Sequence, residues 1–196
     1  MKPSTKTGGK GAALLVIDVQ LGMFGSPQLP PVHDPDKLLS VLAGVIARAR
    51  EAGVRTIYVQ HCGGKESPLQ EGTPPWQIHP AIQPRNGELV IKKRFSDSFQ
   101  QTDLHKVLQA DSIGRLFMVG IQTDFCVDTT CRRAFSLGYA VVLVEDGHST
   151  WGNGVLTAEQ IIAHHNRTLG SSFVKLVRAD SLFEGFPVAV QAKGRP

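Results

Sequence analysis

Continuous apolar runs alternate with segments of helical periodicity along most of the chain. The first run, residues 12–18 (Ala-Ala-Leu-Leu-Val-Ile-Asp), is apolar until it ends in Asp18, as is typical of a strand buried on both faces. Further strands are predicted at 54–60, 89–93, 115–120, 140–145 and 172–177. Because strands that alternate with helices favour a parallel sheet, we expect a three-layer α/β/α fold with six mostly parallel strands.

Four helices are predicted between these strands. The first begins with Asp34 as N-cap and Pro35 at the first helical position, and it ends at Gly53. The other three are expected at 102–109 with Thr102 as cap, at 127–137, and at 157–169, where Thr157 and Gln160 have the spacing of a capping box. The Gly- and Pro-rich stretch 61–87 is predicted to be a long loop of the kind that is usually functional or mobile.

A chain of 196 residues fits one domain with one substantial core. Its hydrophobic content of 41% and charged content of 19% are ordinary for a globular protein. We expect a flexible N-terminus at residues 1–10, a single domain at 11–186 and a flexible tail at 187–196.

Charge and composition also exclude several partners. The net charge of +4 is mildly basic, and no basic run exceeds residues 92–94, so nucleic acid is not an expected partner. No apolar run approaches the roughly 18 residues that span a bilayer, so no membrane partner is expected. Residues 1–10 do not resemble a secretory signal, and three cysteines fit free thiols in a reducing compartment. These features predict a cytoplasmic protein.

The stretch 120–127 (Gly-Ile-Gln-Thr-Asp-Phe-Cys-Val) is the most informative part of the sequence. It follows a predicted strand and precedes a predicted helix, so we expect Cys126 in the first turn of that helix. A helix N-terminus carries unpaired N–H groups and a partial positive charge, which favour a thiolate over a thiol. The same N–H groups can hold an oxyanion. This location therefore predicts a nucleophile beside a stabiliser of the charge that its attack creates.

Three chemically active side chains follow predicted strands. Asp18 ends the first strand, Lys93 ends the third, and Cys126 follows the fourth. Active sites of open parallel sheets form beyond the carboxyl ends of the strands, so these residues are expected to meet. Taken singly, Cys126 is equally typical of a buried small residue and Asp18 of a turn cap. Lys92 and Lys93 point to opposite faces of a strand, so only one of them enters the site.

Several segments together resemble the isochorismatase-like cysteine hydrolases, a family that includes nicotinamidases, N-carbamoylsarcosine amidohydrolase and streptothricin-hydrolase-like members. The matching segments are 14–20 (Leu-Leu-Val-Ile-Asp-Val-Gln), 93–99 (Lys-Arg-Phe-Ser-Asp-Ser-Phe) with 102–104 (Thr-Asp-Leu), 120–127, and 134–146. The resemblance covers roughly residues 12–177. It implies an isochorismatase-like sheet with strand order 3-2-1-4-5-6.

The resemblance also implies a catalytic triad of Cys126, Asp18 and Lys93. Cys126 would attack a carbonyl carbon, Asp18 would take the thiol proton, and Lys93 would pair with Asp18 and hold its orientation. We choose Lys93 because it has the family's spacing to Phe99, and Lys92 is the alternative.

A non-proline cis peptide precedes the cysteine in this family. The corresponding bond here is Ile121–Gln122. The resemblance therefore implies that the backbone N–H groups of Gln122 and Cys126 form the oxyanion hole.

Candidate substrate-binding residues follow the strand ends. They are Gln20, Phe24, His61, Trp76, Phe99 and Trp151. We place His61, Trp76, His148 and Trp151 in loops after strands. Aromatic residues at such places wall a pocket or pack against the protein, and the sequence leaves both open.

We expect neither a metal nor another cofactor. Nicotinamidases carry an Asp-x-His…His zinc site after the second strand, whereas residues 59–64 here read Val-Gln-His-Cys-Gly-Gly. His61 alone lacks the spacing of a zinc site. This departure also argues against nicotinamidase activity.

The leading hypothesis is a cysteine-dependent hydrolase that cleaves a C–N bond (amide, ureide, carbamoyl or lactam) of a small molecule through a thioester. True isochorismatases cleave a vinyl ether and lack the nucleophilic cysteine. Two alternatives stay open: a vinyl-ether hydrolase that uses Asp18 without covalent chemistry, and a non-catalytic small-molecule-binding or thiol-sensing module. The resemblance also implies a homodimer or larger homo-oligomer in which a neighbouring subunit completes the pocket.

Overall fold

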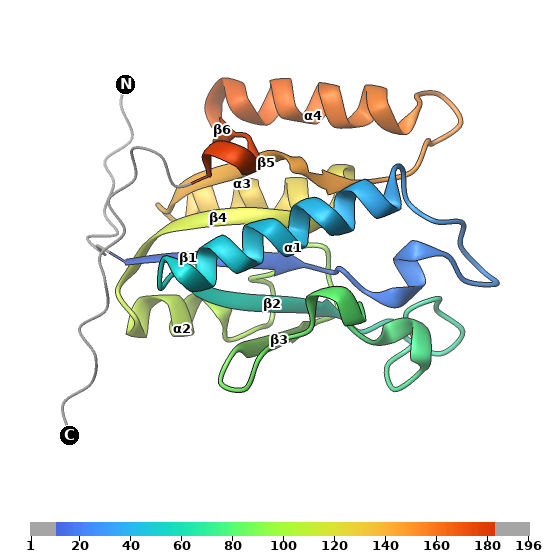
Figure 1. Ribbon diagram of the computed structural model, residues 1–196, viewed down its shortest axis with the longest axis horizontal. Helices are drawn as coiled ribbons and strands as arrows, with labels where there is room; N and C mark the ends of the chain where they lie inside the picture. The colour runs from blue at the N-terminus through green and yellow to red at the C-terminus, as the bar shows by residue number, and fades with distance from the viewer. Residues whose placement is uncertain (1–10, 183–196) are drawn as a thin grey trace.

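Six strands form one sheet in the order β3-β2-β1-β4-β5-β6 (Figure 1). The computed structural model describes residues 11–182. The strands are β1 (Gly11–Ile17), β2 (Arg55–His61), β3 (Leu89–Lys93), β4 (Ile113–Ile121), β5 (Ala140–Ser149) and β6 (Lys175–Val177). Every pairing between neighbouring strands is parallel. The predicted α/β fold and strand order are therefore confirmed.

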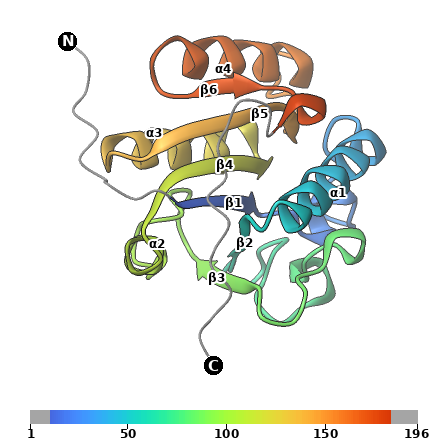
Figure 2. The same cartoon turned by 60° about the vertical axis from the view of Figure 1, so that its left-hand side comes forward.

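Helices cover both faces of this sheet. They are α1 (Pro35–Glu51), α2 (Leu104–Ala110), α3 (Asp128–Ser136) and α4 (Ala158–Ser172). Figure 2 shows α1 on one side of the sheet, with α2 and α3 on the other. None of the helices described between residues 11 and 182 is long and apolar enough to cross a membrane.

Alternate residues of the strands pack into two separate hydrophobic cores, one on each face of the sheet. Leu15 and Ile17 of β1 pack with apolar side chains of α2, α3 and α4. Leu14 and Val16 of the same strand pack with apolar side chains of α1. Since successive side chains of a strand point to opposite faces, a strand between two helical layers must be apolar throughout. This explains the uninterrupted apolar run at the start of the domain.

Of the predicted helix caps, the capping box of α4 is confirmed, whereas the caps of α1 and α2 differ from the prediction. The capping box of α4 is confirmed, because Thr157 Oγ1 accepts the N–H of Gln160 and the Gln160 side chain accepts the N–H of Thr157. Asp34 occupies the N-cap position of α1, but its φ is 47° and its side chain makes no capping hydrogen bond. The second helix begins at Leu104, where the Thr102 hydroxyl accepts the Leu104 N–H at 3.3 Å.

Most strand boundaries lie within two residues of the prediction, and the two larger differences concern β5 and β6. Residue 172 lies in α4, whose hydrogen-bond ladder continues until Phe173 N–H meets the carbonyl of Leu169 at 2.8 Å, so β6 is shorter than expected. β5 extends to Ser149 instead of ending at 145, because the chain rejoins β4 after an irregular segment.

The predicted loop 61–87 contains two short 3₁₀ turns, Pro74–Trp76 and Pro80–Ile82. The flexible ends predicted at 1–10 and 187–196 lie outside the described residues.

Replacing Thr56 by valine is expected to stabilise the protein. Thr56 is buried in β2, and within residues 11–182 its hydroxyl has no hydrogen-bond partner. A buried unpaired hydroxyl costs roughly 1–3 kcal/mol, and valine suits a strand, so Thr56→Val should raise the free energy of unfolding by about 1 kcal/mol. Urea denaturation followed by circular dichroism measures this change. A lower midpoint at an unchanged slope would contradict the prediction.

Candidate active site

The ends of β1 and β4 meet at the carboxyl edge of the sheet. Ile17, the last residue of β1, is paired with Gly120 near the end of β4. Gly120 has a φ of 135°, and a side chain there would clash with the backbone of Ile17. Glycine therefore permits the close approach that brings the segment after β4 to the residue after β1.

That residue is Asp18, which has an unusual backbone conformation. Its φ is 52°, in the left-handed region that non-glycine residues rarely adopt, and its side chain is fully buried. Its N–H donates to the carbonyl of Val59 in β2 at 2.9 Å. Such backbone strain costs on the order of 1–3 kcal/mol and occurs mainly at functional sites.

Lys93 connects Asp18 to the cysteine. Its Nζ lies 2.6 Å from Asp18 Oδ2 and 3.1 Å from Cys126 Sγ, and it donates to the carbonyl of Phe95 at 3.0 Å. The side chains of Lys93 and Asp18 are both 0% exposed. Burial opposes the charge of Lys93, but Asp18 and Cys126 together raise its pKa above the usual value.

The alternation of β3 decides between the two lysines. Lys92 points away from the site and pairs with Glu71 at 2.7 Å, with more than half of its side chain exposed. Lys93 alone of the two reaches Asp18 and Cys126.

Cys126 lies in a wide turn before α3. Residues Thr123–Val127, here named the cysteine turn, form a π-helical turn in which Val127 N–H donates to the carbonyl of Gln122 at 3.0 Å. The turn runs directly into α3, so the prediction of a helical start is correct in place but not in geometry. The peptide bond Ile121–Gln122 that precedes the turn is cis, as predicted.

The surroundings of Cys126 raise the pKa of its thiol above the usual value. Burial, followed by the negative charge of Asp18, raises the pKa of the thiol to about 12, although Lys93 acts in the opposite direction. The helix start alone favours a thiolate, whereas burial and the neighbouring carboxylate favour the thiol, from which Asp18 was expected to take the proton.

The side-chain amide of Gln20 forms its hydrogen bonds with backbone groups of the protein. Its amide nitrogen donates to the carbonyls of His61 and Trp76, at 3.0 and 2.7 Å, and its oxygen accepts the N–H of His61 at 3.0 Å. The side chain is fully buried. Gln20 thus joins the segment after β1 to the end of β2 and to the loop that follows it.

His61 and Trp76 present polar atoms that have no hydrogen-bond partner among residues 11–182. These atoms are His61 Nδ1 and Trp76 Nε1, and both are buried. Burial, and then the charge of Lys93, lowers the pKa of His61, which favours the neutral ring. His61 therefore has unused hydrogen-bonding capacity next to the site, whereas the Trp76 ring lies 4.9 Å from Lys92 Nζ and its side chain interacts with Cys62.

The other predicted aromatic residues have different surroundings. Phe24 is partly buried and lies against His79, with ring centroids 4.8 Å apart. The indole N–H of Trp151 donates to the carbonyl of Pro30 at 2.9 Å. Phe99 does not line the site as expected; it is buried in the core shared with α2, where its ring stacks on Tyr139.

His148 has hydrogen-bond partners that its expected place in a loop did not indicate. It lies in β5 rather than in a loop, and it is 4% exposed. Its Nδ1 is 2.8 Å from Thr123 Oγ1 in the cysteine turn, and its Nε2 is 2.9 Å from Asn166 Oδ1 in α4. The dipeptide Asp146-Gly147 before it is typical of a turn, which hid the continuing strand.

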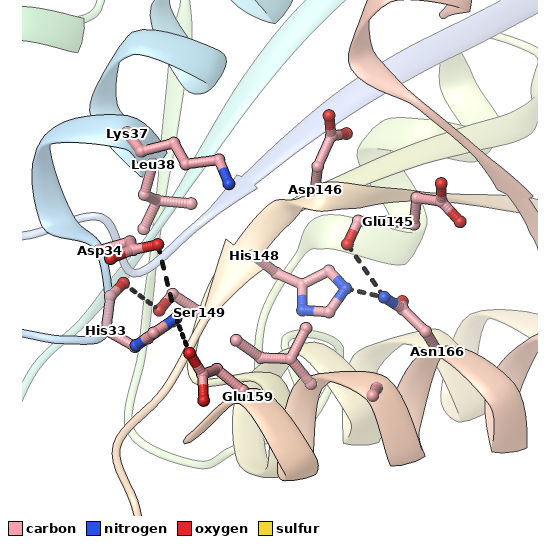
Figure 3. Close-up of a pocket in the computed structure, with 12 residues that line it drawn as sticks. His33, Asp34, Lys37, Leu38, Glu145, Asp146, His148, Ser149, Glu159 and Asn166 are labelled. Carbon is pink, nitrogen blue, oxygen red and sulfur yellow. Dashed lines mark hydrogen bonds and ion pairs between the residues drawn. The ribbon is translucent and has the colours of Figure 1, made fainter. Parts of the chain in front are cut away.

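Two cavities lie beside the residues of the candidate site, one next to Lys93 and the other next to His148. One, of about 340 Å³, lies beside Lys93 and Phe95. The other, of about 310 Å³, lies between α1, α4 and the end of β5, and His148 forms part of its wall (Figure 3). Within the part of the chain that the structure describes, no group of three His, Cys, Asp or Glu side chains is placed to hold a metal ion.

Comparison with known proteins identifies the family. Residues 12–158 match the model of the isochorismatase domain. The chain belongs to the isochorismatase-like hydrolase family. An isochorismatase-family structure from Pseudomonas putida superposes with a TM-score of 0.82 at 29% identity, covering 92% of this chain and 93% of that one.

Two curated relatives have named activities. A streptothricin hydrolase of Streptomyces noursei is 34% identical over 139 residues, which are 71% of this chain and 50% of that protein. The ureidoacrylate amidohydrolase RutB of Agrobacterium fabrum is 32% identical over 127 residues, 50% of this chain and 56% of that protein. The isochorismatase-family chain thus spans about half the length of these two relatives.

Removing Lys93 is expected to destabilise the protein far more than removing Lys92. Lys93→Met leaves the Asp18 carboxylate buried without a counter-charge, which costs roughly 3–5 kcal/mol. Lys92→Met removes only an exposed ion pair and should cost less than about 1 kcal/mol. Urea denaturation of both variants tests the difference. Adding Asp18→Asn to Lys93→Met should recover part of the loss, and equal costs for the two lysines would contradict this account.

The alkylation of Cys126 should depend steeply on pH. Because the pKa is raised, the thiolate fraction is small at neutral pH and grows about tenfold per pH unit. The rate with iodoacetamide, measured from pH 6 to 10 and corrected with Cys126→Ser protein, should rise without levelling off. A plateau below pH 9 would show that the pKa is lowered instead.

Proposed function

We propose that this protein is a cysteine-dependent hydrolase that cleaves a C–N bond of a small amide, ureide, carbamoyl compound or lactam. The observation that carries the proposal is the contact of one buried ammonium, Lys93 Nζ, with both Asp18 Oδ2 and Cys126 Sγ. A thiol, a carboxylate and an ammonium within direct reach supply a nucleophile, a base and a charge to hold the base.

The proposed reaction begins from a protonated thiol. The Asp18 carboxylate pairs with Lys93 and also interacts directly with the Cys126 thiol, so it can accept the proton of that thiol. As Cys126 Sγ attacks the substrate carbonyl carbon, its proton passes to Asp18. The nucleophilic thiolate therefore forms during attack, and it does not need to accumulate beforehand.

The charge that develops on the substrate oxygen requires donors. We assign them to the backbone N–H groups of Gln122 and Cys126, at the two ends of the segment that links the cis peptide to the nucleophile. The C–N bond then breaks, and Asp18 returns the proton to the departing nitrogen. Water attacks the remaining thioester, its proton returns to the Cys126 sulfur, and the carboxylic product leaves.

Recognition of the substrate is assigned to the loop after β2. His61 Nδ1, at the end of β2, is unpaired and offers a hydrogen bond to a polar substrate group, whereas the Trp76 ring contacts Lys92. The relative that is named an amidohydrolase supports an amide-like substrate over a vinyl ether. Neither side chain is part of a metal site in this proposal.

We also propose that the protein acts as a homo-oligomer. Phe125 and Phe95, the neighbours of the cysteine and of the buried lysine, are 52% and 37% exposed. A second copy that covers these rings would remove apolar surface from water and close the site.

Replacing Cys126 should abolish turnover and leave the fold intact. In a panel of small amides, ureides and lactams followed by ammonia or amine release, Cys126→Ser should lose roughly a thousandfold or more in kcat. Cys131→Ala is the matched control, because Cys131 is buried in the core of α3 and should leave turnover unchanged. Mass spectrometry of quenched wild-type reactions should show an acyl adduct on Cys126.

A different pattern would favour the non-covalent alternative. Full activity in Cys126→Ala together with a large loss in Asp18→Asn would exclude the thioester and support hydrolysis by Asp18 alone. A wild-type protein that is alkylated at Cys126 but turns over no member of the panel would favour a binding or sensing role.

A further inference from the structure

An irregular segment of β5 brings His148 to the cysteine turn. Met118 of β4 pairs with Leu143 of β5, whereas Gly120, two residues further along β4, pairs with His148. The extra residues of β5 between these pairs bulge out of the ladder, which re-aims the residue that follows. His148 is thereby placed opposite the last residues of β4, from which the cysteine turn departs.

The hydrogen bonds of Asn166 fix the tautomer of His148. Asn166 Nδ2 donates to the carbonyl of Glu145 at 2.9 Å, so its Oδ1 faces His148 and can only accept (Figure 3). His148 Nε2 must therefore carry the ring proton. It follows that Nδ1 holds a lone pair and that the Thr123 hydroxyl donates to it over 2.8 Å.

This chain of hydrogen bonds is shielded from water. His148 is 4% exposed and Thr123 is 1% exposed. Burial lowers the pKa of His148 to about 4, with Asn166 and Asp146 acting in the opposite direction and His165 adding to the decrease, so the ring stays neutral at ordinary pH. The direction of the Thr123 hydrogen bond is therefore the same throughout that range.

A second hydrogen bond, from the residue that follows β5, reaches the next residue of the turn. Thr150 Oγ1 donates to Asp124 Oδ1 at 2.6 Å. His148 and Thr150 thus hold two consecutive residues of the cysteine turn, while Ser149 between them donates to the carbonyl of His33 at 2.7 Å. The turn is tied to β5 at its start, a few residues before the sulfur.

We infer that His148 is a positioning residue for Cys126: oriented by Asn166, it accepts the Thr123 hydroxyl and so holds the cysteine turn in register with Asp18 and Lys93. This inference rests on the proposed function for its effect on turnover, but its effect on the thiol can be measured without a substrate. A small displacement of the turn would lengthen the 3.1 Å contact between Lys93 Nζ and Cys126 Sγ.

The test removes each end of the hydrogen bond and then restores it. Thr123→Val and His148→Gln should each lower kcat by about 10- to 100-fold with KM changed less than about threefold, because misplacement of a nucleophile affects the chemical step. Thr123→Ser, which keeps the hydroxyl, should restore most of kcat. Matched controls are Thr56→Val, a buried threonine of β2, and His164→Gln, an exposed histidine of α4, and both should retain wild-type kcat.

Alkylation supplies the readout that does not depend on a substrate. The iodoacetamide rate at Cys126 should change several-fold in Thr123→Val and His148→Gln, and it should return towards the wild-type rate in Thr123→Ser. If the wild-type protein hydrolyses no amide but these rates change as expected, the proposed function fails and the positioning role stands. Lower stability with unchanged kcat and alkylation would overturn the inference, since it would show a purely structural role.

A measurement on the wild-type protein covers the case in which variants do not fold. Two-dimensional ¹⁵N–¹H spectra of the histidine rings should show His148 as the neutral Nε2–H tautomer. A neutral Nδ1–H ring, or a doubly protonated ring at neutral pH, would reverse the Thr123 hydrogen bond and overturn the inference.

Discussion

The buried ion pair between Lys93 and Asp18 is the interaction on which the site depends. Two charges without solvent exposure are tolerable only when they compensate each other, so the ends of β1 and β3 must stay within direct contact distance across the end of β2. The left-handed backbone at Asp18 and the close approach at Gly120 are features of the same small region. The observed order of strands thus brings the three side chains together.

The pair also determines the protonation state of the thiol. A lone lysine beside Cys126 would favour the thiolate, but burial first and then the charge of Asp18 act against it and raise the pKa of the thiol. The resting site therefore holds one positive and one negative charge with a neutral nucleophile. Each proton that leaves the sulfur has a defined acceptor, which gives Asp18 a use in both halves of the proposed reaction.

Much of this arrangement follows from the sequence, and the remainder depends on contacts between distant residues. Apolar runs predicted the six strands, and the alternation of a strand predicted that Lys92 and Lys93 diverge. The direction of the Cys126 pKa shift could not be read from the helix start alone, since it depends on burial and on a carboxylate more than 100 positions away in the chain. His148 was missed because the bulge of β5 exists only against β4, and Phe99 was misplaced because the same aromatic residue suits a pocket wall or a core.

The neutral, half-buried thiol has a consequence for the durability of the protein. Peroxide reacts with thiolates, and susceptibility to oxidation follows thiolate character and exposure. A nucleophile that carries its proton until a substrate arrives is a poor target for this damage. Cys131, five positions further along the chain, is fully buried in the core and is not positioned as a solvent-accessible partner for disulfide rescue. Burial and the neighbouring carboxylate thus keep the Cys126 sulfur in its less reactive, protonated form.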